Sequence, residues 1–234
     1  MNEHLSSASL KSQAKGQLLG KYGTLAGIVF IHLGYTVFVL ISSNLLIDAS
    51  SVVGYVMYFA VSIVFSLLEG LLIYGEAYIY LKLACNQPIA VSDLFYGFSN
   101  NPDKILKVQA AFTVVHLIGT LPNAVPVPAS RPYFLLFYVI FTLSVSILYI
   151  VLNIMLSQSF FLMLDFPQYT AREVLTRSVR VMKGSKGRLF YIYLSFLPLI
   201  LLGICSCCIP FIWLQPYMQA VKANFYLDLM KKKQ

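Results

Sequence analysis

The segment TLAGIVFIHLGYTVFVLISSNLLI, residues 24–47, decides the fold class of this protein because it contains no Asp, Glu, Lys or Arg. A helix that crosses the roughly 30 Å hydrocarbon core of a membrane needs about 20 apolar residues. Five further apolar runs follow, at Val52–Ala84, Ile105–Leu121, Tyr133–Leu164, Leu189–Ile204 and Pro210–Leu229. We therefore predict an all-α polytopic membrane protein with six transmembrane helices.

The composition of the whole chain agrees with this fold class. Among 234 residues, 59% are hydrophobic and only 11% are charged, and the mean hydropathy is +0.76. Soluble domains carry about 25% charged residues, and a soluble fold of this size would leave large apolar patches exposed. The net charge of +8 raises the possibility of a nucleic-acid partner. However, Lys and Arg also flank membrane spans, and no aromatic-basic nucleic-acid module is present.

The positions of the basic residues predict the orientation in the membrane. All but one of the 17 Lys and Arg fall on alternate connections between the six spans, and Arg131 is the exception. Positive charge stays on the cytoplasmic side during insertion. We therefore predict a multi-pass protein of the bacterial cell membrane with both the N- and C-termini in the cytoplasm. The groups are Lys11, Lys15 and Lys21, then Lys82, Lys104 and Lys107, then six residues between Arg172 and Arg188, then Lys222, Lys231, Lys232 and Lys233.

The most polar stretch, TAREVLTRSVRVMKGSKGRLF at 170–190, predicts an amphipathic helix on the cytoplasmic leaflet. Thr170 and Glu173 have the spacing of a capping box, and Leu175, Val179 and Met182 share one face. Such a helix lies in the membrane interface, where each basic residue contributes about 1 kcal/mol of attraction to anionic lipid. The residues predicted to contact anionic phospholipids are Arg172, Arg177, Arg180, Lys183, Lys186 and Arg188.

Two other segments resemble this one, SLKSQAKGQLLGKYG at 9–23 and SDLFYGFSNNPDKILK at 92–107. In the first segment Leu10, Ala14 and Leu18 share a face; in the second the apolar residues are Leu94, Phe95 and Phe98. We predict three helical hairpins, each preceded by a cytoplasmic amphipathic helix, within a single domain at 1–234. The units cover roughly 9–84, 92–165 and 170–230.

Polar residues inside the predicted spans are the candidate binding groups. Glu69 and Glu76 are two helical turns apart on one face, and Gln158 and Gln219 fall at a similar depth when the three units are aligned. Intramembrane carboxylates often mark a pathway or a paired site. The open alternatives are pairing with a basic residue near the membrane boundary, hydrogen bonding between helices, and a polar site for transport or proton transfer.

The remaining chemistry-bearing side chains favour structural roles. His32 and His116 are isolated in apolar runs, so packing or helix-to-helix hydrogen bonding is expected for both. Cys205, Cys207 and Cys208 suit a tight turn; Cu(I) binding or a disulfide are the alternatives. We predict no metal site and no cofactor.

The C-terminal segment PYMQAVKANFY, 216–226, together with MKG at 182–184, LKSQAKGQLLGKYG at 10–23 and DLFYGF at 93–98, resembles an uncharacterised integral-membrane family, domain of unknown function 975. The resemblance covers most of the chain. It implies a bacterial, mainly Gram-positive, membrane protein and brings no established activity or catalytic residues. The family is also distantly similar to the membrane domain of some glycerophosphodiester phosphodiesterases.

No nucleotide-binding, metalloprotease or serine-hydrolase motif is present, and the segments outside the predicted spans reach only about 25 residues. We therefore expect no enzyme and no catalytic residue. The sequence favours a non-enzymatic accessory or interaction protein of the cell envelope, whose partners are anionic phospholipids and another membrane protein. The alternative is a small lipid or solute transporter with its polar site at Glu69, Glu76, Gln158 and Gln219.

Overall fold

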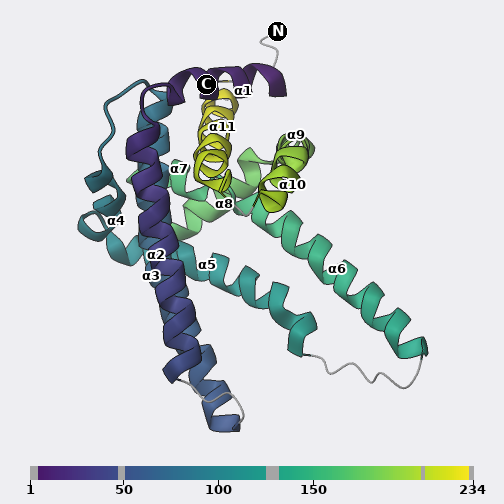
Figure 1. Cartoon of the computed structure of the whole chain (residues 1–234). Helices are drawn as coiled ribbons and strands as arrows, with labels where there is room; N and C mark the ends of the chain where they lie inside the picture. The colour runs from purple at the N-terminus through teal and green to yellow at the C-terminus, as the bar shows by residue number, and fades with distance from the viewer. Residues whose placement is uncertain (1–4, 47–50, 125–131, 207–208, 232–234) are drawn as a thin grey trace.

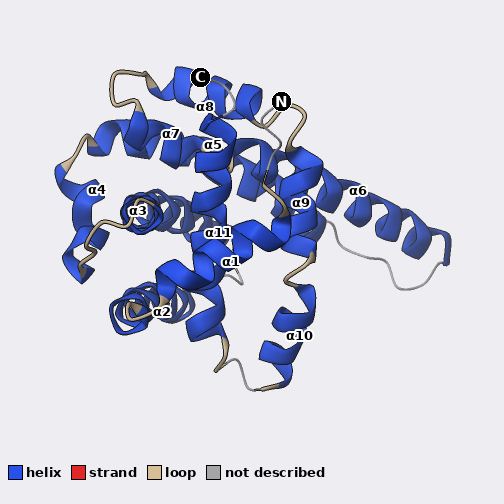
Figure 2. Ribbon diagram, turned by 90° about the horizontal axis from the view of Figure 1, so that it is seen from above, coloured by secondary structure: helices blue, strands red, loops and turns tan. Residues whose placement is uncertain are grey.

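The computed structural model describes residues 5–46, 51–124, 132–206 and 209–231, and every regular element in these ranges is helical (Figures 1 and 2). This confirms the all-α prediction. The elements are α1 (Ser7–Leu18), α2 (Tyr22–Leu46), α3 (Val52–Ala84), η1 (Val91–Phe95), α4 (Tyr96–Ser99), α5 (Pro102–Thr120), η2 (Leu121–Ala124), α6 (Pro132–Leu156), α7 (Ser159–Asp165), α8 (Ala171–Val181), α9 (Lys186–Leu194), α10 (Leu197–Cys205) and α11 (Phe211–Lys231). The elements η1 and η2 are 3-10 helices.

Four helical segments in the described ranges are long and apolar enough to cross a membrane. They are Tyr22–Ser43, Val56–Ala84, Phe134–Asp165 and Lys186–Cys205. The first two correspond to α2 and α3, the third runs from α6 into α7, and the fourth contains α9 and α10. These segments define a multi-pass membrane protein.

The other two predicted spans, α5 and α11, form helices of 19 and 21 residues but are more polar than these four segments. The reason lies in their side chains. Asp103, Lys104 and Lys107 occupy the first turns of α5, and Lys222 and Asp228 lie in the second half of α11. Length and composition thus support four of the six predicted spans.

The hydrophobic core lies at one end of the molecule, which is the upper part of Figure 1. We call this the packed end; it is formed by α1, η1, α4, α7, α8 and the C-terminal parts of α3 and α11. Helix α3 shows the contrast clearly. Its second half, including Leu72, Tyr80 and Leu83, is buried, whereas Val53, Val56 and other residues of its first half are exposed. In Figure 1, α5 and α6 extend away from α2 and α3 at the opposite end.

Glycines in α3 allow its neighbours to approach closely. A Cβ atom added at Gly75 would lie 1.8 Å from the carbonyl oxygen of Leu94 in η1. A Cβ at Gly70 would lie 2.4 Å from Cγ of Gln109 in α5. Only glycine leaves room at these two positions, so both contacts depend on the residue type.

Helix α1 is amphipathic as predicted, but its apolar face packs on protein. Leu10, Ala14 and Leu18 are fully buried, and α1 lies against α11 and α3. The N-terminal helix and the C-terminal end of α11 therefore meet at the packed end (Figure 1).

Helix α8 begins at the predicted capping box. The hydroxyl oxygen of Thr170 accepts from the backbone N–H of Glu173 at 3.3 Å, and the carboxylate of Glu173 accepts from the backbone N–H of Thr170 at 2.8 Å. The helix packs against α7, α5 and α6. Its most buried side chains are Val174, Ser178 and Val181. The face of the helix that packs on the protein therefore differs from the predicted apolar face.

That difference has a physical cause. Of the three residues in the predicted lipid-facing stripe, Met182 is buried, whereas Leu175 and Val179 are half-buried. The hydroxyl of Ser178 donates to the carbonyl of Met155 in α6 at 2.8 Å, which anchors the helix on the protein. The segment before α5 also differs from the prediction. It forms the short helices η1 and α4 instead of one amphipathic helix.

Candidate functional site

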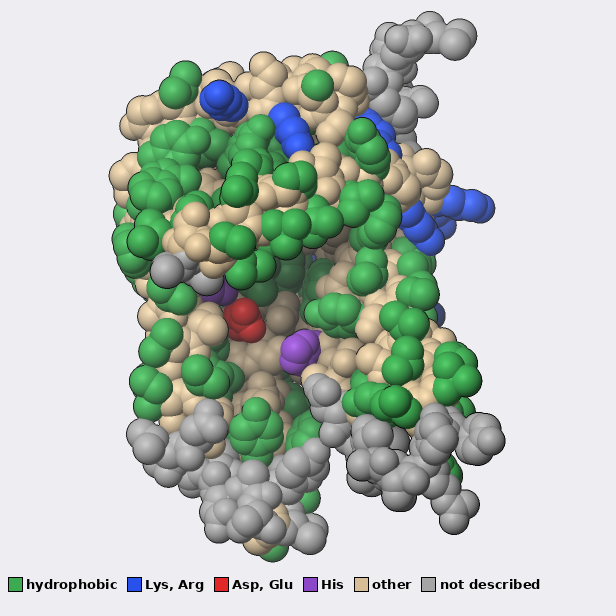
Figure 3. Space-filling model, turned by 45° about the vertical axis from the view of Figure 1, so that its right-hand side comes forward, with side chains coloured by type: hydrophobic (Ala, Val, Ile, Leu, Met, Phe, Trp, Pro, Cys, Tyr) green, Lys and Arg blue, Asp and Glu red, His purple; other side chains and the backbone are tan. Residues whose placement is uncertain are grey.

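A cavity of about 1030 Å³ lies between the helices below the packed end. Its walls come from α2, α3, α5, η2, α6, α7 and α11. Figure 3 shows this side of the molecule as a deep hollow, with acidic and histidine side chains visible inside. The described helices that form the walls include three of the four candidate membrane spans.

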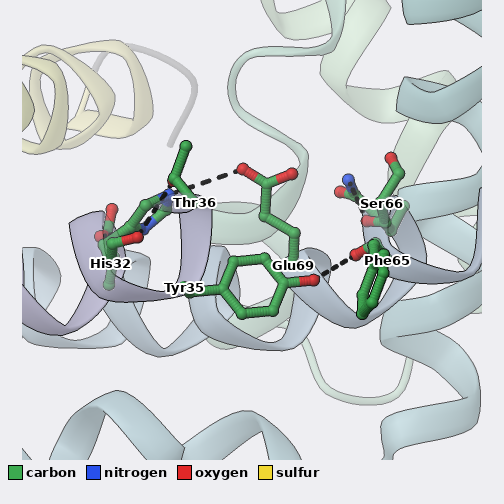
Figure 4. A network of polar contacts seen from close by, with 8 residues as sticks. His32, Tyr35, Thr36, Phe65, Ser66 and Glu69 are labelled. Atoms are coloured by element: carbon green, nitrogen blue, oxygen red, sulfur yellow. Dashed lines mark hydrogen bonds and ion pairs between the residues drawn. The ribbon is translucent and has the colours of Figure 1, made fainter. Parts of the chain in front are cut away.

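His32 of α2 lies between two carboxylates of α3 at the inner part of this cavity. Its Nδ1 atom is 2.8 Å from Oε1 of Glu76. Its Nε2 atom is 3.5 Å from Oε1 of Glu69 (Figure 4). The side chain of Glu76 is only 5% exposed, whereas that of Glu69 is 37% exposed and lines the cavity. One carboxylate is therefore enclosed by protein and the other is open to a ligand.

The geometry of this cluster favours an imidazolium. Nδ1 of His32 is at hydrogen-bond distance from Glu76, and Nε2 is 3.5 Å from Glu69. A neutral imidazole has one N–H and one lone pair, and a carboxylate has only acceptors, so a neutral ring would turn a lone pair toward one carboxylate oxygen. An imidazolium between the two carboxylates satisfies both contacts.

Helix α11 closes the inner end of the cavity with polar side chains. Gln215, Gln219 and Lys222 all line it, and they follow at intervals of three or four residues along one face of the helix. Lys222 lies near enough to Glu76 for a coulombic interaction. The cluster thus holds two carboxylates, one histidine and one amine.

A second polar network joins α2, α3 and α5 next to the cluster. The hydroxyl of Tyr35 donates to the carbonyl of Phe65 at 2.5 Å (Figure 4), and the hydroxyls of Ser66 and Thr113 are 2.9 Å apart. The amide of Gln109 donates to the carbonyl of Ser66 at 3.0 Å. Among the described residues, the Oε1 atom of Gln109 has no hydrogen-bond partner although it is buried.

Three of the four residues of the predicted polar site line the same cavity. Glu69, Glu76 and Gln219 are brought together there. Gln158 is fully buried at the start of α7 and does not line the cavity; its amide donates to the hydroxyl of Ser157, which does. Of the four residues of the predicted polar site, Gln158 is thus the one that the fold keeps out of the cavity.

Sequence reasoning anticipated only part of the roles of His32 and Lys222. For His32 we expected packing or helix-to-helix hydrogen bonding, and its contact with Glu76 agrees with the second, but its place between two carboxylates was not predicted. Lys222 we counted with the C-terminal tail. The signal for His32 was that a polar ring in an apolar run needs a hydrogen-bonding partner. The two carboxylates in the next apolar run need partners for the same reason. The signal for Lys222 was its spacing of three residues from Gln219.

The predicted lipid-contacting residues have different surroundings in the structure. The guanidinium of Arg188 forms an ion pair with Asp228 at 2.6 Å and donates to the carbonyl of Leu5. Arg177 lies over the ring of Tyr169 at 4.0 Å. Arg172, Arg180 and Lys183 are exposed and Lys186 is half-buried. Arg188 thus connects three parts of the packed end, and the exposed members are those best placed for lipid.

A further ion pair and two groups with shifted pKa values, Asp93 and Lys11, lie at the packed end. Burial alone would raise the pKa of Asp93, but hydrogen bonds from Lys82 at 2.7 Å and from the backbone N–H of Ala90 hold this pKa below its ordinary value. Burial lowers the pKa of Lys11, whose amine donates to the carbonyl of Ser195 at 3.2 Å. These contacts fasten η1 to α3 and α1 to the junction of α9 and α10.

No group of three or more His, Cys, Asp or Glu side chains in the described ranges is arranged to hold a metal ion. Cys205 is exposed and is not part of a disulfide within those ranges. Cys207 and Cys208 lie outside the described residues. The described cavity therefore offers proton-transfer and hydrogen-bonding groups.

The apolar helices and the polar cavity between them define the class of the protein: a multi-pass α-helical membrane protein with ionisable groups between its spans. Comparison with family models places it more closely. The chain belongs to the DUF975 family, described as proteins of unknown function, and the match covers residues 1–233. No curated protein and no solved structure matches the chain. The distant similarity to the membrane domain of glycerophosphodiester phosphodiesterases stays a prediction.

Proposed function

We propose that the chain crosses the bacterial cell membrane six times, with the packed end and both termini in the cytoplasm. Helices α5 and α11 are about 28 and 31 Å long at 1.5 Å per residue, which is enough to cross the hydrocarbon core. Their polar residues, such as Gln109 and Lys222, line the cavity. Their lower hydropathy is what a cavity-lining span requires, since polar groups in spans face the protein interior.

A cysteine-labelling experiment tests this topology. In a cysteine-free background, a single cysteine at Ser51, between α2 and α3, should react with an impermeant maleimide added to intact cells. A cysteine at Gln87, between α3 and η1, should react only after the cells are opened. Labelling of both positions from the same side would contradict the proposal.

For function, we propose a non-enzymatic transporter or carrier that binds a small lipid or solute in the cavity. The observation that carries this proposal is the cavity of about 1030 Å³ with the cluster of His32, Glu69 and Glu76 inside it. Known ligand pockets span about 300–1,000 Å³. Apolar wall residues such as Phe112 and Leu117 lie beside these polar groups, which is the pattern that an amphipathic molecule matches.

Native mass spectrometry of the purified protein tests this function. Wild-type protein in lipid nanodiscs should retain a bound small molecule or lipid after gentle activation, and Glu69→Gln should lose it. The matched control is Glu173→Gln, because Glu173 lies outside the cavity and glutamine also serves at the third position of a capping box. Equal occupancy in wild type and Glu69→Gln would count against the cavity as the binding site.

A second candidate function is an accessory role in the cell envelope, in which the basic surface of the packed end grips anionic phospholipid or another membrane protein. The exposure of Arg172, Arg180 and Lys183 favours it. Here, replacing these three by Gln should weaken binding of the protein to soluble or tethered anionic lipid, with no effect on cavity occupancy. The cavity itself favours the transporter over this role, because a scaffold has no need of charged groups in a cavity between spans.

A further inference from the structure

The geometry points to an ammonium-bearing ligand that binds at Glu69 in exchange for one proton of the His32 cluster. This inference rests on the proposed function and names the chemical class of its ligand. The ammonium group comes either from a free amine or from the headgroup of a lipid, and the experiment below separates the two sources.

Charge balance is the first argument. When His32 carries a proton on each nitrogen, two positive groups, His32 and Lys222, face two carboxylates, Glu69 and Glu76. An uncompensated charge buried in a low-dielectric site costs several kcal/mol. A third cation can therefore enter only if a positive charge leaves, and the proton on Nε2 of His32 is the one that faces the cavity-exposed carboxylate.

The positions of the acceptors give the second argument. The side chain of Glu69 is more exposed than those of His32 and Glu76. Its Oε1 atom lies 3.5 Å from Nε2 of His32, which is the longer of the two contacts between His32 and a carboxylate. Gln109 also lines the cavity, is 4% exposed, and has an Oε1 atom that accepts no hydrogen bond from any described residue. A carboxylate and an unsatisfied carbonyl oxygen in one cavity call for a donor, and an ammonium group supplies up to three N–H bonds.

The walls of the cavity suit the rest of such a ligand. Phe112 and Phe160 line it and stack at 5.4 Å between ring centroids, and Tyr35 and Phe65 lie on the side of α2 and α3. Aromatic faces attract organic cations, most strongly where water is excluded. An anionic ligand would instead meet the exposed carboxylate of Glu69.

Among the described residues, His32 is the ionisable group at ion-pair distance from Glu69, so the proton that leaves is assigned to His32 and not to its ionisable neighbours. On α11, Lys222 is the charged group that lines the cavity, and Asp228 is paired with Arg188. On α5, His116 lines the same cavity but makes no described contact with the cluster. On η1, which also packs against α2, Asp93 is held by Lys82. On α2 itself, the hydroxyl of Tyr35 is occupied by Phe65.

The exchange balances in atoms and charge. Before binding, Glu69 and Glu76 are carboxylates, and His32 and Lys222 carry one positive charge each, so the four groups have no net charge. The ammonium group takes the place of the N–H at Glu69, one proton leaves Nε2 to solvent, and the neutral ring keeps the proton on Nδ1 for Glu76. The ligand's positive charge replaces that of the proton, so the total stays at zero.

Isothermal titration calorimetry tests the exchange on purified protein in nanodiscs. The soluble probes are the primary amines ethanolamine and butylamine, titrated in buffers of different ionisation enthalpy. We expect release of close to one proton per bound cation, and an affinity that rises about tenfold per pH unit while the free site holds that proton. Glu69→Gln should abolish binding of both probes, and Glu173→Gln should leave it unchanged.

A second arm identifies the source of the ammonium group. Nanodiscs that contain phosphatidylethanolamine are compared with nanodiscs of phosphatidylglycerol alone, with native mass spectrometry as the readout. Retention of phosphatidylethanolamine in wild type and its loss in Glu69→Gln would support a lipid source, even if the soluble amines do not bind. Binding of an amine without proton release would overturn the exchange.

Preferential binding of inorganic phosphate or phosphatidylglycerol in the cavity would overturn the ligand class. In that case the cavity would still bind a ligand, so the proposed function would stand while this inference fails. If neither amine probe nor either lipid is retained by the wild-type protein, the proposed function and the inference are both wrong.

Discussion

Nδ1 of His32 lies 2.8 Å from Oε1 of Glu76, although 44 residues separate them in the chain. The contact joins α2 to α3 at the depth where the packed end meets the open cavity. Helix α3 has 33 residues and is about 50 Å long, well beyond the roughly 30 Å hydrocarbon core. The contact therefore fixes the register of the shorter helix, α2, against a longer partner that has room to slide.

Glu76→Ala should destabilise the protein by about 3 kcal/mol, because removing one partner of a buried pair leaves the other charge uncompensated. Glu76→Gln should cost less, since its amide oxygen still accepts from the ring. Thermal unfolding of the purified protein in detergent measures both variants. The double variant His32→Ala with Glu76→Ala should be less destabilised than the sum of the single variants, and simple additivity would show that the pair does not interact.

Gly75→Ala should destabilise the protein by about 3 kcal/mol or prevent its accumulation, because the new Cβ would lie 1.8 Å from the carbonyl oxygen of Leu94. The matched control is Gly34→Ala in α2, where no atom lies within 4 Å of an added Cβ. Replacing glycine by alanine in an open helical position is favourable by up to about 1 kcal/mol. Equal thermal stability of the two variants would contradict the close packing of η1 on α3.

Arg188→Gln should lower the stability of the protein, because Arg188 pairs with Asp228 and holds the carbonyl of Leu5. Loss of a partner from a mostly buried ion pair costs about 3 kcal/mol; we expect somewhat less here because the side chain of Arg188 is 21% exposed. Lys183→Gln, at an exposed position of the same basic segment, should change stability by less than about 0.5 kcal/mol. Liposome flotation should show the reverse order, with the larger loss of anionic-lipid binding in Lys183→Gln.

Acid should weaken the attachment of η1 to α3. Because the folded protein lowers the pKa of Asp93, its carboxylate stabilises the fold above the ordinary pKa of aspartate, about 4. That contribution is lost as the pH falls through the lowered value. Wild type should therefore be more stable than Asp93→Asn at pH 6, and the gap should shrink toward pH 3. A gap that is constant with pH would show that the Lys82–Asp93 pair does not carry this effect.

The amphipathic segments show how far sequence periodicity reaches. The apolar face of α1 and the capping box of α8 were both predicted correctly, because they depend on residues three or four positions apart. The prediction that these faces lie on lipid was incomplete. Leu10 and Met182, from the two predicted faces, are buried in the hydrophobic core, and periodicity alone cannot tell a protein neighbour from a lipid neighbour because both are apolar.

The candidate site shows the same limit. Glu69 and Glu76 stood out because a carboxylate within an apolar run is costly, and their shared face follows from their spacing of seven. Their partner in the structure is His32 on the preceding helix, which agrees with the alternative of hydrogen bonding between helices. Nothing in the spacing of His32 indicates which way its ring points.

The sequence alone determined that this chain is an all-helical, multi-pass membrane protein of the DUF975 family, because hydropathy and helical periodicity are local properties of neighbouring residues. The tertiary structure decided which polar groups meet. In the structure His32 lies between two carboxylates, Lys222 lines the cavity, and Arg188 forms an internal ion pair with Asp228. Those outcomes depend on how separate helices rotate and slide against one another, and packing between distant segments sets that geometry.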